Sequence, residues 1–484
     1  MEPLIFELSH EQHPAPSTQH PAPNFGTMSR TSALPFPRLS EPEVVRHFTK
    51  LSQKNFSIDG NFYPLGSCTM KYNPRRNEAA ASLPKWSQSH PFQAIDTMQG
   101  SLEVMYNLEQ YLCHLTGFDA FTLQPLAGAH GESCGLMLIK KYHESRGDLT
   151  RNKVIVPDAS HGTNPATAGA LGWSIITVPS NKRGGVDVEA LKKVVGSDTA
   201  ALMLTNPNTL GLFDENISEI TEIIHQAGGQ CYYDGANANA TVGRCRPADL
   251  GFDVAHLNLH KTFSTPHGGG GPGAGPVGVK SHLETYLPAG RIQHSAPSTQ
   301  HQGRSTQHKV FTITEPTSQS IGRLHPAFGN AGVLMRAYAY TRTLGGEGFR
   351  RVSERAVLNA NYLRKKLAGA YLIPYDRICQ HEFVISLAPE RKQYGVRALD
   401  VAKRLIDYGI HPPTIYFPLI VSECLMIEPT ETESKQTLDQ FVDVMLKIKA
   451  EIQTQPELLH NAPHHAPVSR LDEVKAVKAP ILAA

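Results

Sequence analysis

Short apolar runs alternate with amphipathic stretches through the middle of the chain. Helix-like stretches cover residues 131–144, 188–195 and 218–227, where apolar positions recur at helical spacing. Seven interleaved apolar runs have the length of buried strands: Phe121–Leu126, Lys153–Pro157, Ser174–Pro179, Ala200–Asn206, Gln230–Asp234, Val254–His260 and Gly275–Val279. This alternation predicts an α/β fold, with a mostly parallel seven-stranded sheet covered by helices on both faces. Ligands of such sheets bind at the carboxyl ends of the strands.

The pattern changes on both sides of this region. Residues 10–37 are rich in Pro, His, Ser and Thr and predict an extended arm, and a helix is expected from Glu41. Long helical patterns return at Val333–Leu344 and Gly348–Leu367, and mixed strands and helices follow: Glu382–Leu387, Ala398–Asp407 and Lys435–Ile452. We therefore expect an N-terminal arm and helical segment (1–115), a large domain (116–328), a smaller α+β domain (329–455) and a flexible tail (456–484).

A polar segment at about 290–309 interrupts the large domain. It contains the string STQH twice, and residues 294–301 (HSAPSTQH) nearly copy residues 13–20 (HPAPSTQH). We interpret it as a low-complexity surface insertion. A metal-binding His tract is the alternative, but Gln, Ser and Pro dominate the spacing, and we expect no metal.

Charge and cysteine content narrow the function classes. The 46 basic and 44 acidic side chains leave a formal net charge of +2, without the clustered basic surplus of a nucleic-acid-binding protein. The seven cysteines lack Cys-x-x-Cys spacing, which is typical of reduced thiols. The N-terminal segment carries acidic residues and no signal-peptide pattern, and no apolar run approaches the roughly 20 residues of a membrane span. We expect a cytoplasmic protein that binds neither membrane nor nucleic acid.

Lys261 is the first candidate for chemistry. It lies with His260 and Thr262 where an apolar run ends, before four consecutive glycines. A lysine at a buried strand end is costly unless it is paired, neutralised or used covalently, and loss of solvent makes its amine nucleophilic. Taken alone, such a lysine is more often exposed beside a flexible loop, so its neighbours decide the interpretation.

Asp234 ends another predicted strand, 27 residues before Lys261. A carboxylate at that place can keep the ring nitrogen of pyridoxal 5'-phosphate (PLP) protonated, which makes the ring an electron sink. The turn 126–132 (LAGAHGE) joins a strand to a helix, so the N–H groups of Ala129, His130 and Gly131 can bind a phosphate there. Each feature also has a simpler interpretation. Asp234 could only cap a turn, and 126–132 could be an ordinary Gly-containing turn, because it matches no nucleotide-binding motif.

Two further residues follow strands at the same predicted edge. His161 could stack on the cofactor ring, and Asn206 could bond its phenolic oxygen; the alternative for His161 is a loop histidine bonded to backbone. Thr262 could add a hydroxyl to the phosphate site. We also expect His260 to contact the cofactor. The order phosphate turn, ring contact, polar strand end, Asp and Lys is that of the aspartate-aminotransferase-like PLP fold (fold type I).

Several long strings resemble one family, the glycine-cleavage-system P-protein, or glycine dehydrogenase (decarboxylating). They are residues 61–75 (NFYPLGSCTMKYNPR), 158–168, 233–239, 260–279 and 412–435. The chain is half the length of the two-halved family members and has the lysine, so it resembles subunit 2 of the split form. The resemblance implies a partner, subunit 1, with two copies of each subunit in a heterotetramer.

The resemblance also implies the reaction, that of glycine dehydrogenase (aminomethyl-transferring). Glycine would bind PLP in place of Lys261, lose carbon dioxide, and pass its aminomethyl group to the lipoyl arm of the H-protein. Lys261 is expected as the Schiff-base lysine, Asp234 as the pyridinium partner and His161 as the stacking residue. Ser67, Cys68 and Thr69 fall in a motif expected near the glycine and lipoyl pocket. Cys68 could exchange with the lipoyl disulfide, but a small buried residue in a tight turn is the favoured interpretation.

Two other hypotheses are kept. One is a cysteine desulfurase or aminotransferase of the same fold, although no motif marks a substrate-binding arginine in the small domain. The other is a catalytically silent structural subunit, against which Lys261 and Asp234 argue directly.

Overall fold

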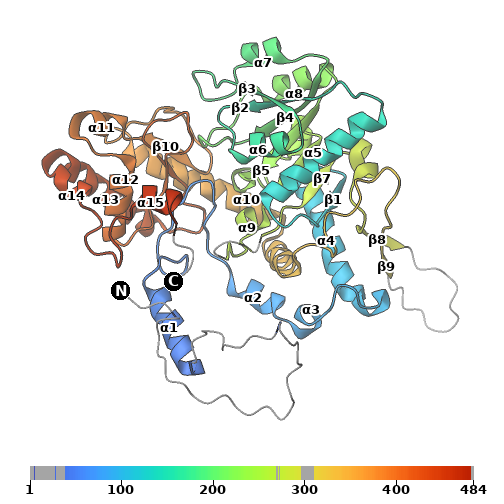
Figure 1. Cartoon of the computed structure of the whole chain (residues 1–484), viewed down its shortest axis with the longest axis horizontal. Helices are drawn as coiled ribbons and strands as arrows, with labels where there is room; N and C mark the ends of the chain where they lie inside the picture. The colour runs from blue at the N-terminus through green and yellow to red at the C-terminus, as the bar shows by residue number, and fades with distance from the viewer. Residues whose placement is uncertain are drawn as a thin grey trace.

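The chain folds into a large α/β domain and a smaller C-terminal domain, which lie side by side with helix α10 between them (Figure 1). The structure, a computed structural model, describes residues 5, 28, 39–268, 271, 273–295 and 310–480. Most of the arm at 10–37 and the STQH repeats lie outside the described residues. Within the described part of the chain, no helix is long and apolar enough to cross a membrane.

The seven predicted strands form a single sheet, which confirms the sequence prediction. They are β1 (Ala120–Thr122), β2 (Lys153–Pro157), β3 (Ser174–Val178), β4 (Thr199–Thr205), β5 (Gln230–Gly235), β6 (Val254–Leu257) and β7 (Val277–Val279). Their order is β1-β7-β6-β5-β4-β2-β3. Only β7, between β1 and β6, runs antiparallel to its neighbours, so the carboxyl ends of the other six strands share one edge.

Both faces of the sheet are buried, because alternate residues of each strand enter separate hydrophobic cores. One core packs Val154, Met203 and Val254 against α5 (Gly128–Ser145) and α6 (Thr163–Ala170). The other packs Ile155, Leu204 and the neighbouring strands against four helices: α4 (Gln99–Thr116), α7 (Val188–Val194), α8 (Ile217–Gln226) and α10 (Ala331–Leu367). The continuous apolar strands of the sequence reflect this two-sided burial.

The sixth strand is shorter than predicted, and this changes the setting of Lys261. The expected strand Val254–His260 ends at Leu257, and Leu259–Thr262 forms a single helical turn, α9. Asn258 causes the change, because its carbonyl oxygen accepts the N–H groups of Lys261 and Thr262 at 3.0 and 3.2 Å. Lys261 therefore lies on a helical turn just beyond the strand, half-buried, and not at a buried strand end.

The C-terminal domain is built on a three-stranded antiparallel sheet in the order β10-β12-β11. These strands are β10 (Phe383–Ser386), β12 (Cys424–Ile427) and β11 (Thr414–Ile415). They pack with α11 (Ala388–Tyr394), α12 (Ala398–Asp407), α13 (Lys435–Thr454) and the end of α10 around a third core. The two helices predicted at 333–344 and 348–367 are the halves of α10, which bends at Gly345 (φ 61°, ψ −176°).

The N-terminal segment crosses to the C-terminal domain before it reaches the large one. It contains α1 (Glu41–Gln53), α2 (Arg75–Ala81), α3 (Pro84–Ser87) and the 3-10 turn η3 (Ile95–Met98). Between α1 and α2, Leu65 pairs with Ile427 of β12, and Glu428 N donates to Pro64 O at 3.3 Å. The string 61–75 thus runs along the edge of the small sheet.

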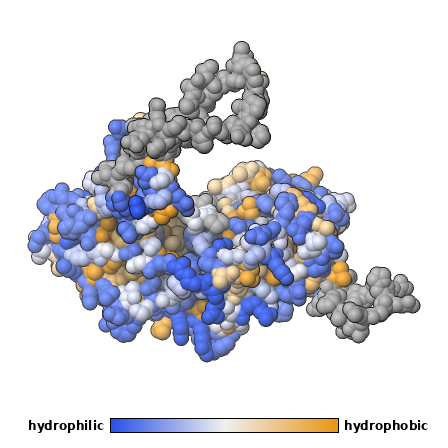
Figure 2. Space-filling view, turned by 90° about the horizontal axis from the view of Figure 1, so that it is seen from below, coloured by the Kyte–Doolittle hydropathy of each residue, from blue (hydrophilic) through white to orange (hydrophobic). Residues whose placement is uncertain are grey.

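Two segments are more ordered than the sequence predicts. Residues flanking the STQH repeats form a hairpin of β8 (Ile292–Ser295) and β9 (Val310–Ile313), with Ile292 and Phe311 buried. The segment 456–484 was expected as a flexible tail, but it begins with α14 (Pro456–His460), whose Leu459 is fully buried against the small-domain core. A further helix, α15 (Glu473–Lys478), buries none of its residues. Figure 2 shows one face of the molecule, where hydrophobic residues are scattered among hydrophilic ones.

The packing of α14 predicts a measurable contribution to stability. Replacing Leu459 with alanine removes a fully buried side chain, so the free energy of unfolding should fall by about 2–5 kcal/mol. Leu471→Ala is the matched control, because Leu471 is 68% exposed and its loss should cost under about 0.5 kcal/mol. Urea unfolding of the two variants measures the difference, and equal midpoints would contradict the packed position of α14.

Candidate functional site

The five sequence-predicted segments meet at one edge of the large sheet. The turn before α5 follows β1, His161 follows β2, Asn206 follows β4, Asp234 lies in β5, and Lys261 follows β6. These strands run in the same direction, so their carboxyl ends bring the segments together. The structure thus produces the juxtaposition that the sequence predicted, while the role of each residue stays a prediction.

Lys261 has no hydrogen bond or ion pair among the residues that the structure describes. Its charge nevertheless acts on its surroundings, and it contributes to lowering the pKa of both His260 and His267. Burial is the main cause of those shifts and takes the two pKa values to about 3 and about 4, so both imidazoles are neutral near pH 7. An uncommitted amine among neutral histidines is free to form a covalent bond.

Asp234 is 2% exposed and is held by three donors. Its carboxylate accepts hydrogen bonds from Asn164 Nδ2 (3.0 Å), Thr205 Oγ1 (3.1 Å) and Ala236 N (3.0 Å). His256 Nε2 lies 3.4 Å from the same carboxylate. Burial alone would raise the pKa of Asp234, but His256 and the hydrogen bonds outweigh it and hold that pKa below its ordinary value. The carboxylate therefore stays ionised, as the partner of a protonated ring nitrogen must.

Helix α5 begins at Gly128, directly after Ala127. The first N–H groups of a helix lack intrahelical partners, so those at Ala129 and His130 are available to an anion. Gly131 N already donates to Ala127 O at 2.9 Å. The glycines permit close packing here, since a Cβ at Gly131 would lie 2.7 Å from Gly275 O and one at Gly128 2.7 Å from Asn258 Nδ2. The phosphate-sized anion site predicted at this turn is therefore compatible with the backbone.

His161 is half-buried, and its ring meets Phe417 edge-on at 5.5 Å between centroids. Its Nδ1 lies 2.8 Å from Thr163 Oγ1, and that hydroxyl in turn donates to Glu132 at 2.7 Å. Burial lowers the pKa of His161, with Asp234 opposing the shift and Lys261 adding to it. The ring is therefore neutral and fixed in orientation, which suits stacking on an aromatic cofactor.

Asn206 and Thr262 are fully buried with unsatisfied donors. Asn206 Oδ1 accepts Asp214 N at 3.0 Å, while within the described part of the chain its Nδ2 has no partner and the Thr262 hydroxyl has none either. Unsatisfied buried donors are costly, so a bound ligand or water is expected to complete them. Thr262 also lines a small cavity of about 20 Å³ with Tyr233, Val242 and Phe263 among others, so its predicted hydrogen bond to a phosphate stays a prediction.

Ser67, Cys68 and Thr69 form a tight turn of the N-terminal segment. Ser67 and Thr69 have positive φ values of 65° and 49°, which are unfavourable for residues with a side chain. Two buried carboxyl groups hold the turn: Ser67 N donates to Glu382 Oε2 and Thr69 N to Glu428 Oε2, both at 2.8 Å. Burial raises the pKa of Cys68 to about 11, against a lowering by Lys261. The thiol is therefore protonated and lies within range of the Lys261 charge.

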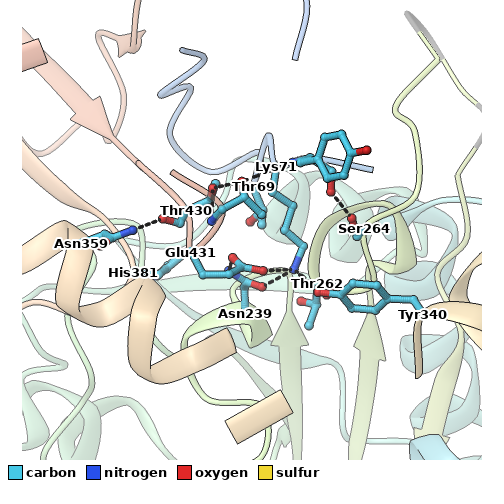
Figure 3. Close-up of polar contacts among 12 residues, drawn as sticks. Thr69, Lys71, Asn239, Thr262, Ser264, Tyr340, Asn359, His381, Thr430 and Glu431 are labelled. Carbon is cyan, nitrogen blue, oxygen red and sulfur yellow. Dashed lines mark hydrogen bonds and ion pairs between the residues drawn. The ribbon is translucent and has the colours of Figure 1, made fainter. Parts of the chain in front are cut away.

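The sequence analysis missed Lys71, which is the most heavily bonded lysine of this region (Figure 3). Its side chain is 1% exposed, and its Nζ donates to Glu431 Oε1 (2.7 Å), Asn239 Oδ1 (2.8 Å) and Thr262 O (2.9 Å). Tyr340 Oη lies 3.2 Å away. Although burial lowers the pKa of Lys71, the charge and hydrogen bond of Glu431 outweigh it and raise that pKa.

Lys71 thus ties the string 61–75 to the helical turn that carries Lys261. The bond to the Thr262 carbonyl fixes α9, while Glu431 and Tyr340 come from the C-terminal domain and α10. Glu431 Oε2 also accepts Asn239 Nδ2 at 3.1 Å. The only sequence signal was the position of Lys71 inside the string resembling the family, because its partners lie 168–360 residues away.

The residues present fit PLP. A free amine at Lys261, an ionised Asp234, a neutral His161 and the open N–H groups of α5 match the aldehyde, ring nitrogen, ring face and phosphate of this cofactor. The buried Nδ2 of Asn206 lacks the acceptor that the phenolic oxygen of the cofactor would supply.

The chain is similar along nearly its whole length to proteins named "Probable glycine dehydrogenase (decarboxylating) subunit 2". The relative from Caldanaerobacter subterraneus subsp. tengcongensis is 54% identical, over 99% of this chain and 98% of its own. Those from Bacillus velezensis and Listeria monocytogenes are 54% and 52% identical over 99% of this chain. A family model described as "Glycine dehydrogenase, C-terminal domain" matches residues 352–465.

Solved structures show the same fold. The inhibitor-bound glycine decarboxylase (P-protein) of the glycine cleavage system superposes with a TM-score of 0.72 at 20% identity, covering 87% of this chain and 92% of its own. The cysteine desulfurase of Thermococcus onnurineus superposes with a TM-score of 0.60 at 16% identity, covering 85% and 99%. The predicted aspartate-aminotransferase-like fold (fold type I), with a large mostly parallel sheet and a smaller C-terminal domain, is confirmed.

Proposed function

Because the chain belongs to the glycine dehydrogenase (decarboxylating) subunit 2 family, we propose that it is the PLP-bearing subunit that decarboxylates glycine. The observation that carries the proposal is Lys261, which has no ion pair with any described residue, at the same sheet edge as the ionised Asp234. Relatives named for this activity match almost the whole chain, so the site lies in the shared sequence. The enzyme releases carbon dioxide and transfers the aminomethyl group to a lipoyl arm.

Each residue has a definite task in this reaction. When bound, PLP supplies an electron sink that accepts the electrons left behind as carbon dioxide departs. Lys261 would hold the cofactor covalently and would give it up to the amine of glycine. Asp234 keeps the ring nitrogen protonated, and His161 covers the ring face. Ala129 and His130 would donate their open N–H groups to the phosphate at the start of α5, with Thr262 and His260 beside them, while Gly131, whose N–H is already used by Ala127 O, would let the backbone pack closely there. Asn206 Nδ2 would donate to the phenolic oxygen.

The partners follow from the same proposal. The "subunit 2" of the relatives' names implies a subunit 1, and we infer two copies of each in the complex. The carrier of the transferred group is the lipoyl-bearing H-protein, whose arm enters near Ser67, Cys68 and Thr69. We also infer that the complex works in the cytoplasm.

The arginines of the small domain argue against an aminotransferase, the main alternative reaction of this fold. An aminotransferase needs an arginine for the substrate carboxylate, but Arg364 pairs with Asp376, and Arg350 and Arg351 pair with Glu347. Arg377 donates to Phe213 O at 2.6 Å. A silent structural subunit would not need the uncommitted Lys261.

Exchange of labelled carbon dioxide into the carboxyl group of glycine tests the proposal. We expect exchange when this chain, PLP, subunit 1 and lipoylated H-protein are combined, and none when this chain is left out. Transamination of another amino acid without glycine exchange would instead favour an aminotransferase, and sulfide release from cysteine a desulfurase.

A further inference from the structure

His381, Glu382 and Glu428 form a buried cluster that the cofactor contacts do not use. All three side chains are 0% exposed. His381 Nε2 lies 3.8 Å from Glu382 Oε1 and 3.9 Å from Glu428 Oε1. Among the residues that the structure describes, neither ring nitrogen of His381 has a hydrogen-bond partner, and Glu382 Oε1 has none. Buried polar atoms without a hydrogen-bond partner are rare, so a functional role for this cluster is worth testing.

A carboxylate oxygen of Glu382 lies within 4.8 Å of one of Glu428, and two buried carboxyl groups this close cannot both be ionised. Burial, followed by the charge of Glu428, raises the pKa of Glu382 well above its ordinary range. Burial raises the pKa of Glu428 to about 7, although the hydrogen bonds from Thr69 lower it. Burial lowers the pKa of His381 to about 3, so the imidazole is neutral and cannot compensate the pair. The carboxyl groups must therefore retain a proton.

The cluster lies within range of the Lys261 charge. The charge of Lys261 acts on Glu382, Glu428 and His381, and it also acts on Cys68, which lies between the two residues bonded to the carboxyl groups. Among the described residues, Lys261 is the cation that bears on both Glu382 and His381. Glu431 is the further acid that faces Glu428, and it is already paired with Lys71.

We propose that Glu382 and Glu428 are a buried acid pair that holds one proton and delivers it to the sulfur leaving the lipoyl disulfide. This inference rests on the proposed function, because that reaction needs such a proton. A bond forms between the glycine α-carbon and one sulfur as carbon dioxide leaves, and the sulfur–sulfur bond breaks. Its electron pair stays on the second sulfur, which takes the proton from the pair and becomes a thiol. The pair regains a proton from the ammonium group that glycine brings, so no outside oxidant or reductant is needed.

The open acceptor sites and the turn geometry support this role. Glu382 and Glu428 each use one oxygen to hold the Ser67–Thr69 turn, so their positions are set by the segment expected beside the lipoyl arm. Thr69 Oγ1 donates to Glu428 Oε1 at 2.6 Å, which leaves Glu382 Oε1 as the open oxygen of the pair. A proton on the pair is thus held next to the Ser67–Thr69 turn.

Infrared spectroscopy of the complex with subunit 1 and PLP measures the proton directly. We expect the carbonyl stretch of a protonated carboxyl group near neutral pH, lost or shifted in Glu382→Gln and in Glu428→Gln. Its intensity should fall without vanishing as pH rises through about 7, because Glu428 loses its proton there while Glu382, whose pKa is raised well above its ordinary range, keeps its own. Glu451→Gln is the control, since pairing with Arg404 helps to hold the pKa of Glu451 below its ordinary value and this carboxylate carries no proton. A stretch unchanged in both cluster variants would overturn the proposal.

Partial reactions separate this inference from the proposed function. Glutamine keeps the shape of each side chain, so the affinity for glycine should stay within about threefold of wild type. The change in cofactor absorbance measures this affinity. Transfer to the oxidised lipoyl arm should fall about 10²–10⁴-fold, the range of general acid catalysis. Unchanged transfer, or a divalent metal retained by these three residues in stoichiometric amount, would refute the acid pair. Absence of glycine binding in the wild-type complex would instead refute the proposed function, whatever the infrared result.

Discussion

Replacing Lys261 with alanine is expected to abolish the Schiff-base absorption band of the chain with PLP and to reduce glycine decarboxylation by about 10³-fold or more. The side chain lies on α9 without a hydrogen bond or ion pair among the described residues, so its removal disturbs no structural contact. Loss of activity should therefore occur without loss of stability. Absorbance spectra and the exchange assay, measured on the complex with subunit 1, test the two parts separately.

Lys182→Ala is the control for Lys261→Ala. Lys182 is exposed on the loop after β3, the end strand of the sheet, and three strands separate β3 from β6, so its variant should keep both the band and the exchange. A Schiff-base band that survives in Lys261→Ala would place the attachment point on another lysine. If the Lys261→Ala variant still bound PLP without a Schiff base and without activity, the assignment would be supported, because the phosphate and ring contacts would remain.

Replacing Lys71 with methionine is expected to lower the free energy of unfolding by about 3–5 kcal/mol. Methionine fills the volume but leaves Glu431 as an unpaired buried carboxylate, and it leaves the Thr262 carbonyl and Asn239 Oδ1 without their donor. Denaturant unfolding of the purified chain measures the loss. Because Thr262 follows Lys261 directly, the same variant should weaken PLP binding in spectroscopic titration.

Lys192→Met provides the comparison for Lys71→Met. Lys192 also forms two ion pairs, with Glu189 and Glu219, but it is 44% exposed, so its loss should cost at most about 1 kcal/mol. The double variant Lys71→Met/Glu431→Leu removes both buried charges and should recover part of the stability lost in Lys71→Met. If Lys71→Met and Lys192→Met lowered the free energy of unfolding equally, the buried ion pair of Lys71 with Glu431 would not be a major contributor to stability.

Local patterns were sufficient for the large domain because its strands are buried on both faces and read as continuous apolar runs. All seven were placed within a few residues, and the helices at 398–407 and 435–452 were found from their amphipathic spacing. The errors occurred where a single backbone hydrogen bond or one buried side chain redirected the chain. Asn258 ended β6 early and turned Lys261 onto α9, and Leu459 anchored a segment whose composition suggested a loose tail.

The carboxyl-edge residues could be predicted because the topology of a parallel sheet places strand ends together. Lys261, Asp234, His161 and Asn206 each follow a recognisable apolar run, so chain order alone indicated their meeting. Lys71 and the cluster of His381, Glu382 and Glu428 carry no such signal. Each lies outside the helices and strands, and its significance depends on burial and on partners hundreds of residues distant.

The sequence by itself determined the fold class and the sheet edge at which the candidate residues meet, because periodicity and strand order are local properties that survive into the structure. Only the tertiary structure decided which charges are buried together. The Ser67–Thr69 turn crosses to the small-domain sheet, where Glu382 and Glu428 bind its N–H groups, and Lys71 joins Glu431 to α9. Burial raises the cost of every unpaired charge, so the protonation of these groups follows from where the chain places them.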